Sequence, residues 1–277
     1  MDDHHNPQPQ PQPATKLEYF DDMWKLHSTA TLLSHIFQEE SGERRRGVLI
    51  LDSTIFHPQG GGQPSDTGFI EIEDSVSRFV VADVRSKDGV VFHYGFFEGS
   101  EGIEVDSLIE KGTKVELYLD EARRGLNSRL HSAGHLLDVC LEDVGLGHLV
   151  PGKAYHFPDG PFVEYKGAVA QNELLSKREE LERHANALIS RGGKVSAAVL
   201  PYDEACTMCG GNLPDYISKD STPRIVKIGD NPGCPCGGTH VVDISDINGI
   251  KVPQIRSKKG MTKVFYNIPD QSYAQLQ

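Results

Sequence analysis

The stretch Arg129–Cys140 reads R-L-H-S-A-G-H-L-L-D-V-C, and the rest of the chain is organised around it. Its two histidines, His131 and His135, are four residues apart, which places them on one face of an α-helix. A helix is expected because apolar residues recur at steps of three and four. These residues are Leu126, Leu130, Ala133, Leu137 and Leu141. With Asp120 suited to cap its start, the predicted helix presents two imidazoles to one object, most simply a zinc ion.

A second pair of candidate ligands lies further along the chain. Residues 234–240 read C-P-C-G-G-T-H, so Cys236 and His240 are again four apart. The glycines between them let the backbone turn tightly around a bound group. Three nitrogens and one sulfur suit zinc better than calcium or magnesium, which prefer oxygen. The sequence therefore predicts a Zn²⁺ site with four ligands: His131, His135, Cys236 and His240.

A competing interpretation uses the cysteines alone. Cys206 and Cys209 form a C-x2-C pair, and Cys234 with Cys236 could complete a four-cysteine structural site. A zinc ribbon usually carries two C-x2-C pairs, whereas the second pair here is C-x-C. The two interpretations compete for Cys236. They also differ in consequence, because a four-cysteine site is closed, whereas a histidine-rich site can keep a position open for water or substrate.

The composition is that of an ordinary globular protein. The chain has 277 residues, enough for two domains, with 38% hydrophobic and 25% charged residues. No apolar run approaches the roughly 18 residues that span a bilayer, and the start M-D-D-H-H-N is unlike a secretory or organellar leader. Four of the five cysteines lie between residues 206 and 236, which favours metal or thiol chemistry in a reducing compartment. We therefore expect a cytoplasmic protein.

The charge is strongly negative but unevenly distributed. The formal net charge of −12, from 40 acidic and 28 basic residues, argues against broad, non-specific binding of nucleic acid. The stretch between Asp246 and Asp270 has no acidic residue. It carries five bases: Lys251, Arg256, Lys258, Lys259 and Lys263. A local basic face that contacts RNA is predicted there, with the cluster Arg44–Arg46 as the alternative contact.

From residue 16 to residue 119 the chain is predicted to be β structure. Turn signals such as Lys87-Asp-Gly89 separate short segments that are apolar or alternate in polarity. The segments are residues 47–51, 68–72, 78–84, 90–94 and 115–119. Strands at this spacing without helices between them indicate a small barrel or sandwich, and we predict a small β-barrel domain over 16–119. Residues 1–15, which contain P-Q-P-Q-P-Q-P, are predicted to be a disordered tail.

Inside this β region the chain reads F-H-P-Q-G-G-G-Q-P-S-D-T-G from Phe56 to Gly68. Three consecutive glycines offer N–H donors and allow a close approach of the backbone to another group. A long flexible hairpin loop is the alternative, because glycine-rich loops are common. The spacing of the glycines does not decide between a loop that approaches another group closely and a flexible hairpin loop.

The second half is predicted to be α+β. A hairpin is expected around Pro158–Gly160, followed by an amphipathic helix over Gln171–Ser190. Further strands are expected at 195–200, 224–228 and 263–268. The predicted fold class is thus α+β: a small N-terminal β-barrel domain, then an α+β domain over residues 120–277 with a helix-covered antiparallel sheet that carries the zinc site.

The motifs H-S-A-G-H, G-G-G-Q and C-G-G-T-H occur together in this chain. Together they resemble the editing domain of alanyl-tRNA synthetase and the free-standing alanyl-tRNA editing proteins called AlaX. The metal-binding pairs alone are shared with the editing domain (second additional domain) of threonyl-tRNA synthetase, and G-G-G-Q in an N-terminal β domain favours the alanyl type. The resemblance covers roughly residues 30–268. Because the length leaves no room for an aminoacylation domain, a stand-alone editor is expected, with a monomer as the expected state.

The resemblance implies zinc-dependent hydrolysis of the ester that joins a wrong amino acid to tRNA(Ala), chiefly serine, with glycine as a further candidate. The family's ligands carry over to the four residues named above. The substrate pocket is expected to include Gly60, Gly61, Gly62, Gln63 and Thr239. One departure is His57, because the family often has tyrosine there, which leaves the role of this position open.

Two questions stay open at this point. The group that recognises the serine hydroxyl could be Thr239, Gln63 or the backbone near Gly152, because a site that hydrogen-bonds a hydroxyl can reject an analogue that lacks it. The function could also be that of a zinc-stabilised RNA-binding module without activity, or of an editor of another mischarged tRNA such as Ser-tRNA(Thr).

Overall fold

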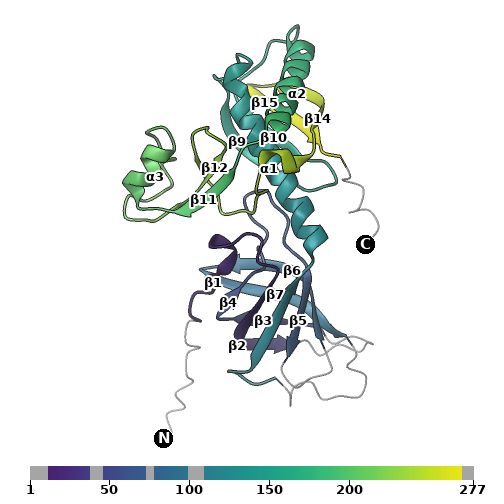
Figure 1. Cartoon of the computed structure of the whole chain (residues 1–277), viewed down its shortest axis with the longest axis vertical. Helices are drawn as coiled ribbons and strands as arrows, with labels where there is room; N and C mark the ends of the chain where they lie inside the picture. The colour runs from purple at the N-terminus through teal and green to yellow at the C-terminus, as the bar shows by residue number, and fades with distance from the viewer. Residues whose placement is uncertain (1–11, 38–45, 73–77, 99–108, 270–277) are drawn as a thin grey trace, which may run out of the picture.

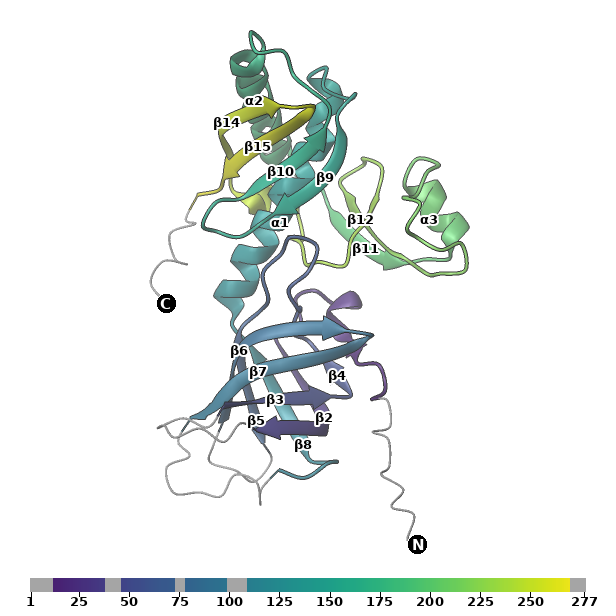
Figure 2. The same ribbon diagram turned by 180° about the vertical axis from the view of Figure 1, so that it is seen from behind.

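The computed structural model describes residues 12–37, 46–72, 78–98 and 109–269. It shows a barrel at one end and a helix-covered sheet at the other, and the long helix α1 leads from the first to the second (Figures 1 and 2). The predicted α+β class is confirmed.

Six strands close into a barrel in the order β2-β3-β7-β6-β5-β8, and every neighbouring pair is antiparallel. Their interior is filled by apolar side chains, among them Leu49, Phe79 and Leu117, because alternate residues of a strand face inward. The predicted barrel is therefore confirmed. The strands are β2 (His27–Phe37), β3 (Arg46–Leu51), β5 (Gly68–Ile72), β6 (Arg78–Lys87), β7 (Val90–Glu98) and β8 (Lys114–Leu119).

The chain enters the barrel through a short segment that was predicted in part as tail. Thr15 is buried, donates its hydroxyl to the carbonyl of Leu51 at 3.2 Å and accepts the N–H of Val91 at 3.0 Å. The predicted tail is therefore wrong at its end, because Thr15 already belongs to the folded chain. The pair β1 (Lys16–Leu17) and β4 (Ser53–Thr54) and the turn η1 (Glu18–Phe20) follow. Residues 1–11 of the predicted tail lie outside the described residues.

The glycine-rich loop leaves the barrel between β4 and β5 and reaches toward α1 (Figure 1). Gly60 and Gln63 exchange backbone hydrogen bonds of 3.1 and 2.9 Å, and both residues between them have positive φ, 57° at Gly61 and 83° at Gly62. A two-residue turn with this handedness strongly favours glycine at both positions. The three glycines thus form the tip of a hairpin-like loop.

Helix α1 (Glu121–Asp143) begins where predicted, because the Asp120 carboxylate accepts the N–H of Arg123 at 3.0 Å. Helix α2 (Leu174–Arg191) also lies close to its predicted place, and the predicted hairpin is formed by β9 (Val150–Tyr155) and β10 (Phe162–Lys166).

The four-stranded antiparallel sheet has the order β14-β15-β10-β9. Its outer hairpin consists of β14 (Lys251–Lys258) and β15 (Met261–Asn267), so the basic run from Lys251 is a strand and a turn. Helices α1 and α2 lie behind the sheet in Figure 2, and Leu137, Leu181 and Val264 pack in one core with it. The predicted helix-covered sheet is confirmed.

A smaller three-stranded unit lies beside this sheet. It has the order β11-β12-β13, from β11 (Val195–Val199), β12 (Arg224–Ile228) and β13 (Cys234–Pro235), and carries the short helix α3 (Tyr202–Met208). The segment after β13 crosses to the turn η3 (Ile244–Ile247) and passes α1 on the way. This crossing brings residues 236–240 to the helix.

A buried ion pair joins α1 to the barrel loop. Arg124 and Asp66 are both fully buried, and their closest contact is 2.6 Å from Nη2 to Oδ2. The guanidinium also donates to the carbonyls of Met23 and of Ile55, and Asp66 accepts the N–H of His57 at 2.6 Å. The first turn of the helix is therefore fixed to the base of the glycine-rich loop.

No helix in the described ranges is long and apolar enough to cross a membrane.

Candidate metal centre

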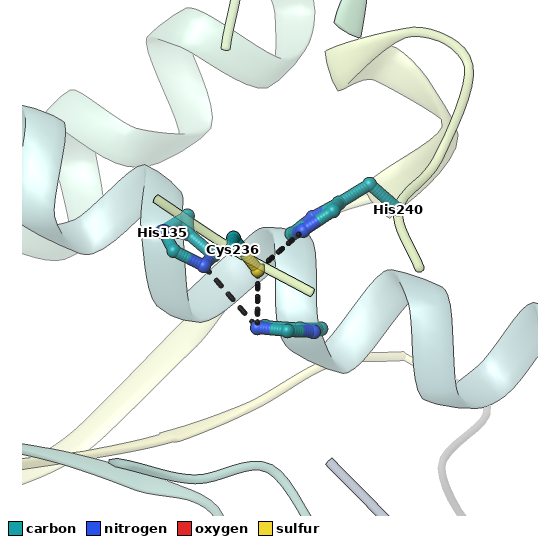
Figure 3. Close-up of side chains that lie close together, drawn as sticks. His135, Cys236 and His240 are labelled. Carbon is teal, nitrogen blue, oxygen red and sulfur yellow. Dashed lines mark hydrogen bonds between the residues drawn. The ribbon is translucent and has the colours of Figure 1, made fainter. Parts of the chain in front are cut away.

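Four side chains predicted as ligands lie together in the structure. The candidate ligand atoms of His131, His135, Cys236 and His240 all lie within 4.8 Å of one another. The Nε2 atoms of His131 and His135 are 3.2 Å apart, and the Cys236 Sγ lies 3.5 Å from the first and 3.3 Å from the Nε2 of His240 (Figure 3). Helix α1 supplies the two histidines of the H-x3-H pair, and the segment after β13 supplies the other two ligands.

Each histidine directs its Nε2 to the centre because its Nδ1 has another partner. The Nδ1 of His131 lies 2.7 Å from the Gln63 Oε1, that of His240 lies 3.1 Å from the Ser132 Oγ, and that of His135 lies 3.2 Å from the Cys234 Sγ. Partners of this kind fix the tautomer and the ring orientation of metal ligands.

The electrostatics of the four groups also suit a cation. Burial lowers the pKa of His135 to about 4, and burial followed by neighbouring histidines holds the pKa of His131 and His240 well below the usual range. Neutral imidazole is the form that binds metal. Burial raises the pKa of the Cys236 thiol, while the Gly238 N–H and the Arg224 guanidinium lower it. Three neutral nitrogens and a sulfur therefore fit a metal ion of the zinc type.

Gln63 reaches this centre from the barrel loop. Its side chain is fully buried, its Oε1 also accepts the Thr239 N–H at 3.0 Å, and its Nε2 donates to the Thr239 Oγ1 at 2.9 Å. The Thr239 hydroxyl lies a further 2.8 Å from the Ser128 Oγ. Both side chains that were predicted for the substrate pocket thus bond to neighbours within the protein.

The close backbone approach in the glycine-rich turn occurs at Gly62. A Cβ there would lie 2.6 Å from the carbonyl oxygen of Ala154 on β9, and the Gly62 carbonyl accepts the His156 N–H at 2.8 Å. A Cβ on Gly61 would meet nothing within 4 Å, and one on Gly60 only a carbonyl at 3.9 Å. The need for a small residue is therefore greatest at one glycine of the three.

Two residues next to the centre were not anticipated from the sequence. His156 is buried, and its ring stacks on that of His131 with centroids 4.6 Å apart. Arg224 on β12 is buried and donates from Nη1 to the carbonyls of Cys236 and Gly238 at 2.8 and 2.9 Å. The sequence offered no signal for either, because each stands alone without a partner at helical spacing.

The four-cysteine interpretation is wrong for the described part of the chain. There, His131, His135, Cys236 and His240 are the one group of three or more candidate ligands that converges. The Cys236 sulfur contacts two of these histidines, while the Cys206 thiol donates to the carbonyl of Gly211 at 3.0 Å.

Several side chains of the predicted basic face already contact other residues of the protein. Lys251 pairs with Glu182 at 2.8 Å, and Lys263 lies 3.6 Å from a Glu164 oxygen and 3.7 Å from the centre of the Phe162 ring. Arg256 lies over the Phe265 ring at 5.3 Å. Lys258 and Lys259 at the turn between β14 and β15 are exposed. In the alternative cluster, Arg44 and Arg45 lie outside the described residues.

His57, the position that departs from the family pattern, is buried at the base of the loop. Burial lowers its pKa to about 4, and its ring meets that of Tyr19 edge-on at 5.4 Å. The side chain thus packs between the loop and the turn η1 as a neutral imidazole.

Comparisons with known proteins show what the chain as a whole is similar to. The family model described as "tRNA synthetases class II (A)" matches residues 2–123. The chain is 34% identical over 217 residues to the alanyl-tRNA editing protein AlaX-L of Pyrococcus horikoshii, covering 78% of this chain and 50% of that protein. It is 29% identical over 229 residues to the editing protein AlaX-M of Methanosarcina barkeri, covering 80% and 89%.

The similarity extends to a segment of much longer enzymes. The chain is 30% identical over 243 residues to the alanine–tRNA ligase of Methanosarcina mazei, covering 87% of this chain and 24% of the ligase. It thus spans half the length of the AlaX-L protein and about a quarter of that ligase. With the four candidate ligands brought together in the fold, the chain is similar to the AlaX family of alanyl-tRNA editing proteins and to part of alanine–tRNA ligase.

Proposed function

We propose that the chain hydrolyses the ester of tRNA(Ala) charged with the wrong amino acid, chiefly serine, with glycine as a second substrate. The observation that carries the proposal is the convergence of His131, His135, Cys236 and His240 in a chain similar to editing proteins. His135 and Cys236 are only half-buried, so the centre can be reached from their side.

Hydrolysis of an aminoacyl ester requires only a moderate rate enhancement from the site. An aminoacyl ester is already reactive, so positioning supplies much of the rate. A bound Zn²⁺ would polarise the ester carbonyl or lower the pKa of a water molecule. The protein's own residues hold this geometry: Gln63 and Ser132 orient two of the imidazoles, and Arg224 fixes the turn that carries Cys236.

The boundary between the two proposed domains lies between residues 119 and 120. In this division residues 16–119 form the barrel domain, which presents the glycine-rich loop, and residues 120–277 form the domain that carries the ligands. The acceptor end of tRNA(Ala) would reach the centre past the loop, with the basic turn at Lys258 and Lys259 contacting the backbone. The division is supported by the end of the last barrel strand at Leu119, immediately before α1.

The test is deacylation of tRNA(Ala) carrying serine, glycine or alanine by the purified protein. We expect rapid loss of serine and slow loss of alanine, and we expect that replacing His131 and His135 together with alanine abolishes both deacylation and bound metal. His184→Ala, which changes a histidine paired with Asp143 on the surface, is the control and should change neither. Full metal content in the double variant would reject the site. Hydrolysis of Ser-tRNA(Thr) but not Ser-tRNA(Ala) would reject the substrate.

A further inference from the structure

His156 lies against the candidate metal centre without belonging to it. It follows the last residue of β9 and is only 2% exposed. Its ring is stacked on that of His131 with centroids 4.6 Å apart and planes inclined by 29°, and the ring of His135 is 6.5 Å away. The imidazole therefore borders the candidate centre on the side of His131.

The hydrogen bonds of this imidazole fix which nitrogen carries the proton. The Tyr266 hydroxyl donates to the carbonyl of Leu130 at 2.9 Å, so its oxygen is free to accept. The Nδ1 of His156 lies 2.6 Å from that oxygen. Nδ1 is therefore the N–H donor, and in the neutral ring Nε2 presents a lone pair.

Two glycines lie against the edges of this ring. A Cβ on Gly134 of α1 would lie 2.4 Å from the Cε1 and 2.8 Å from the Nδ1 of His156, and a Cβ on Gly62 would lie 3.1 Å from its Cδ2. The absence of side chains at both positions lets the imidazole pack closely between α1 and the glycine-rich loop. Within the described residues Nε2 makes no hydrogen bond to the protein. The Nε2 acceptor is thus unused, and the bond from Nδ1 to Tyr266 holds the ring that carries it in place.

Two of the three groups expected to recognise a substrate hydroxyl, the side chains of Gln63 and Thr239, are already engaged, and the backbone near Gly152 was the third candidate. Both ends of the Gln63 amide bond to His131 or Thr239, the Thr239 hydroxyl bonds to Gln63 and contacts Ser128, and both side chains are fully buried. His156, whose ring stacks on that of His131, keeps an acceptor that no donor among the described residues reaches.

We propose that the Nε2 of His156 accepts the hydrogen bond of the serine hydroxyl and so selects serine over alanine, an inference that rests on the proposed editing function. An alanyl group would leave this acceptor without a donor. A site that hydrogen-bonds a hydroxyl discriminates strongly against the analogue that lacks it, because its own polar group is then unpaired.

Two substitutions at His156 distinguish a role in recognising the serine hydroxyl from a role in packing. In His156→Asn the amide lies where Nδ1 was, so it can keep the bond to Tyr266 while the acceptor at Nε2 is lost. In His156→Gln the longer side chain places its amide near the former Nε2, so an acceptor is kept. The pair is measured on tRNA(Ala) charged with serine and with glycine, because the glycyl ester has no hydroxyl.

We expect His156→Asn to lower kcat/KM for the seryl ester at least about tenfold relative to the glycyl ester, in line with the loss of one buried hydrogen bond. His156→Gln should keep most of that ratio, and both variants should bind as much metal as the parent. A parallel fall for both esters in His156→Asn, or an unchanged ratio, would overturn the assignment while leaving the editing function intact. If the parent protein hydrolyses neither ester, the proposed function itself fails.

Discussion

At the scale of single residues, Gln63 is the point at which the barrel touches the candidate metal centre. Its Oε1 accepts from His131 and from the backbone of Thr239, and no other side chain of the described loop bonds to a candidate ligand. Removing it would leave two buried donors without acceptors and would free the His131 ring to change tautomer.

We therefore expect Gln63→Ala to weaken metal binding about 10- to 100-fold, the usual effect of losing an outer partner of a ligand. Competition with a chelator measures this directly, without reference to turnover. Gln59→Ala, on the exposed part of the same loop, is the control and should keep the parent affinity. Equal affinity of the two variants would show that the amide does not support the metal.

The candidate ligands could be found from the sequence because each pair repeats at the spacing of a helical turn. His156 and Ser132 could not, since nothing in their spacing distinguishes them from core residues, and their roles depend on contacts with residues more than a hundred positions away. The sequence also placed Gln63 and Thr239 in the pocket, but their burial and mutual bond become evident only in three dimensions.

At the scale of elements, the turn Gly60–Gln63 depends on one glycine more than on the others. We expect Gly62→Ala to lower deacylation at least about tenfold, because its Cβ would collide with the Ala154 carbonyl and displace Gln63. Gly61→Ala carries a positive φ of the same kind but meets no neighbour, so it should cost only the strain, about 1 kcal/mol. Steady-state kinetics and thermal unfolding of both variants provide the comparison.

A larger fall in deacylation for Gly61→Ala than for Gly62→Ala would show that the exposed tip meets the substrate and that the contact with β9 is secondary. From the sequence, all three glycines carry equal weight, because their identity alone contains no information about neighbours.

Two of the longer strands, β2 and β14, escaped prediction, and the pairing of each contains a register shift. The register of β2 shifts between Leu32 and Ser34, and that of β14 shifts between Lys251 and Gln254 around Pro253. A bulge inserts an extra residue and reverses the inside–outside alternation, so the period-two pattern that marks a strand is interrupted. Strands β3 and β8 were recognisable, and so was β6, although its pairing with β7 shifts between Val81 and Asp83, so a register shift weakens the pattern without always hiding the strand.

At the scale of the whole molecule, a net charge of −12 means that an anionic tRNA must be met by a local basic surface. Lys258 and Lys259 of the predicted basic run are exposed, whereas Lys251 and Lys263 each pair with a glutamate and Arg256 lies over the Phe265 ring. The turn between β14 and β15 is therefore the best candidate contact.

Replacing Lys258 and Lys259 with alanine should weaken tRNA binding and flatten the dependence of log affinity on log salt. The slope should fall by about one unit for each phosphate that these lysines neutralise. Turnover at saturating tRNA should change little. A double variant of the exposed Lys194 and Lys219 is the control and should keep the parent slope. If the slope persists in the first variant and falls in one of the Arg44–Arg46 cluster, the tRNA approaches over the barrel.

The change from strands to a long helix near residue 120 was predictable, because the spacing of apolar residues changes there from that of strands to that of a helix. The contact between the barrel loop and the helix was not, since it rests on pairs far apart in the chain, such as Arg124 with Asp66 and His131 with Gln63. Such pairs leave no periodic trace in the sequence.

The Arg124–Asp66 pair restricts how a chain of this kind can accumulate mutations. Removing one partner of a buried pair costs about 3–5 kcal/mol, because the remaining charge has no access to water. Both side chains here are fully enclosed, so a change at either position alone would be strongly disfavoured. A barrel transplanted from a relative would need a carboxylate at the same place in its loop. Substitutions in the barrel loop and in the ligand-bearing helix are therefore expected to occur together.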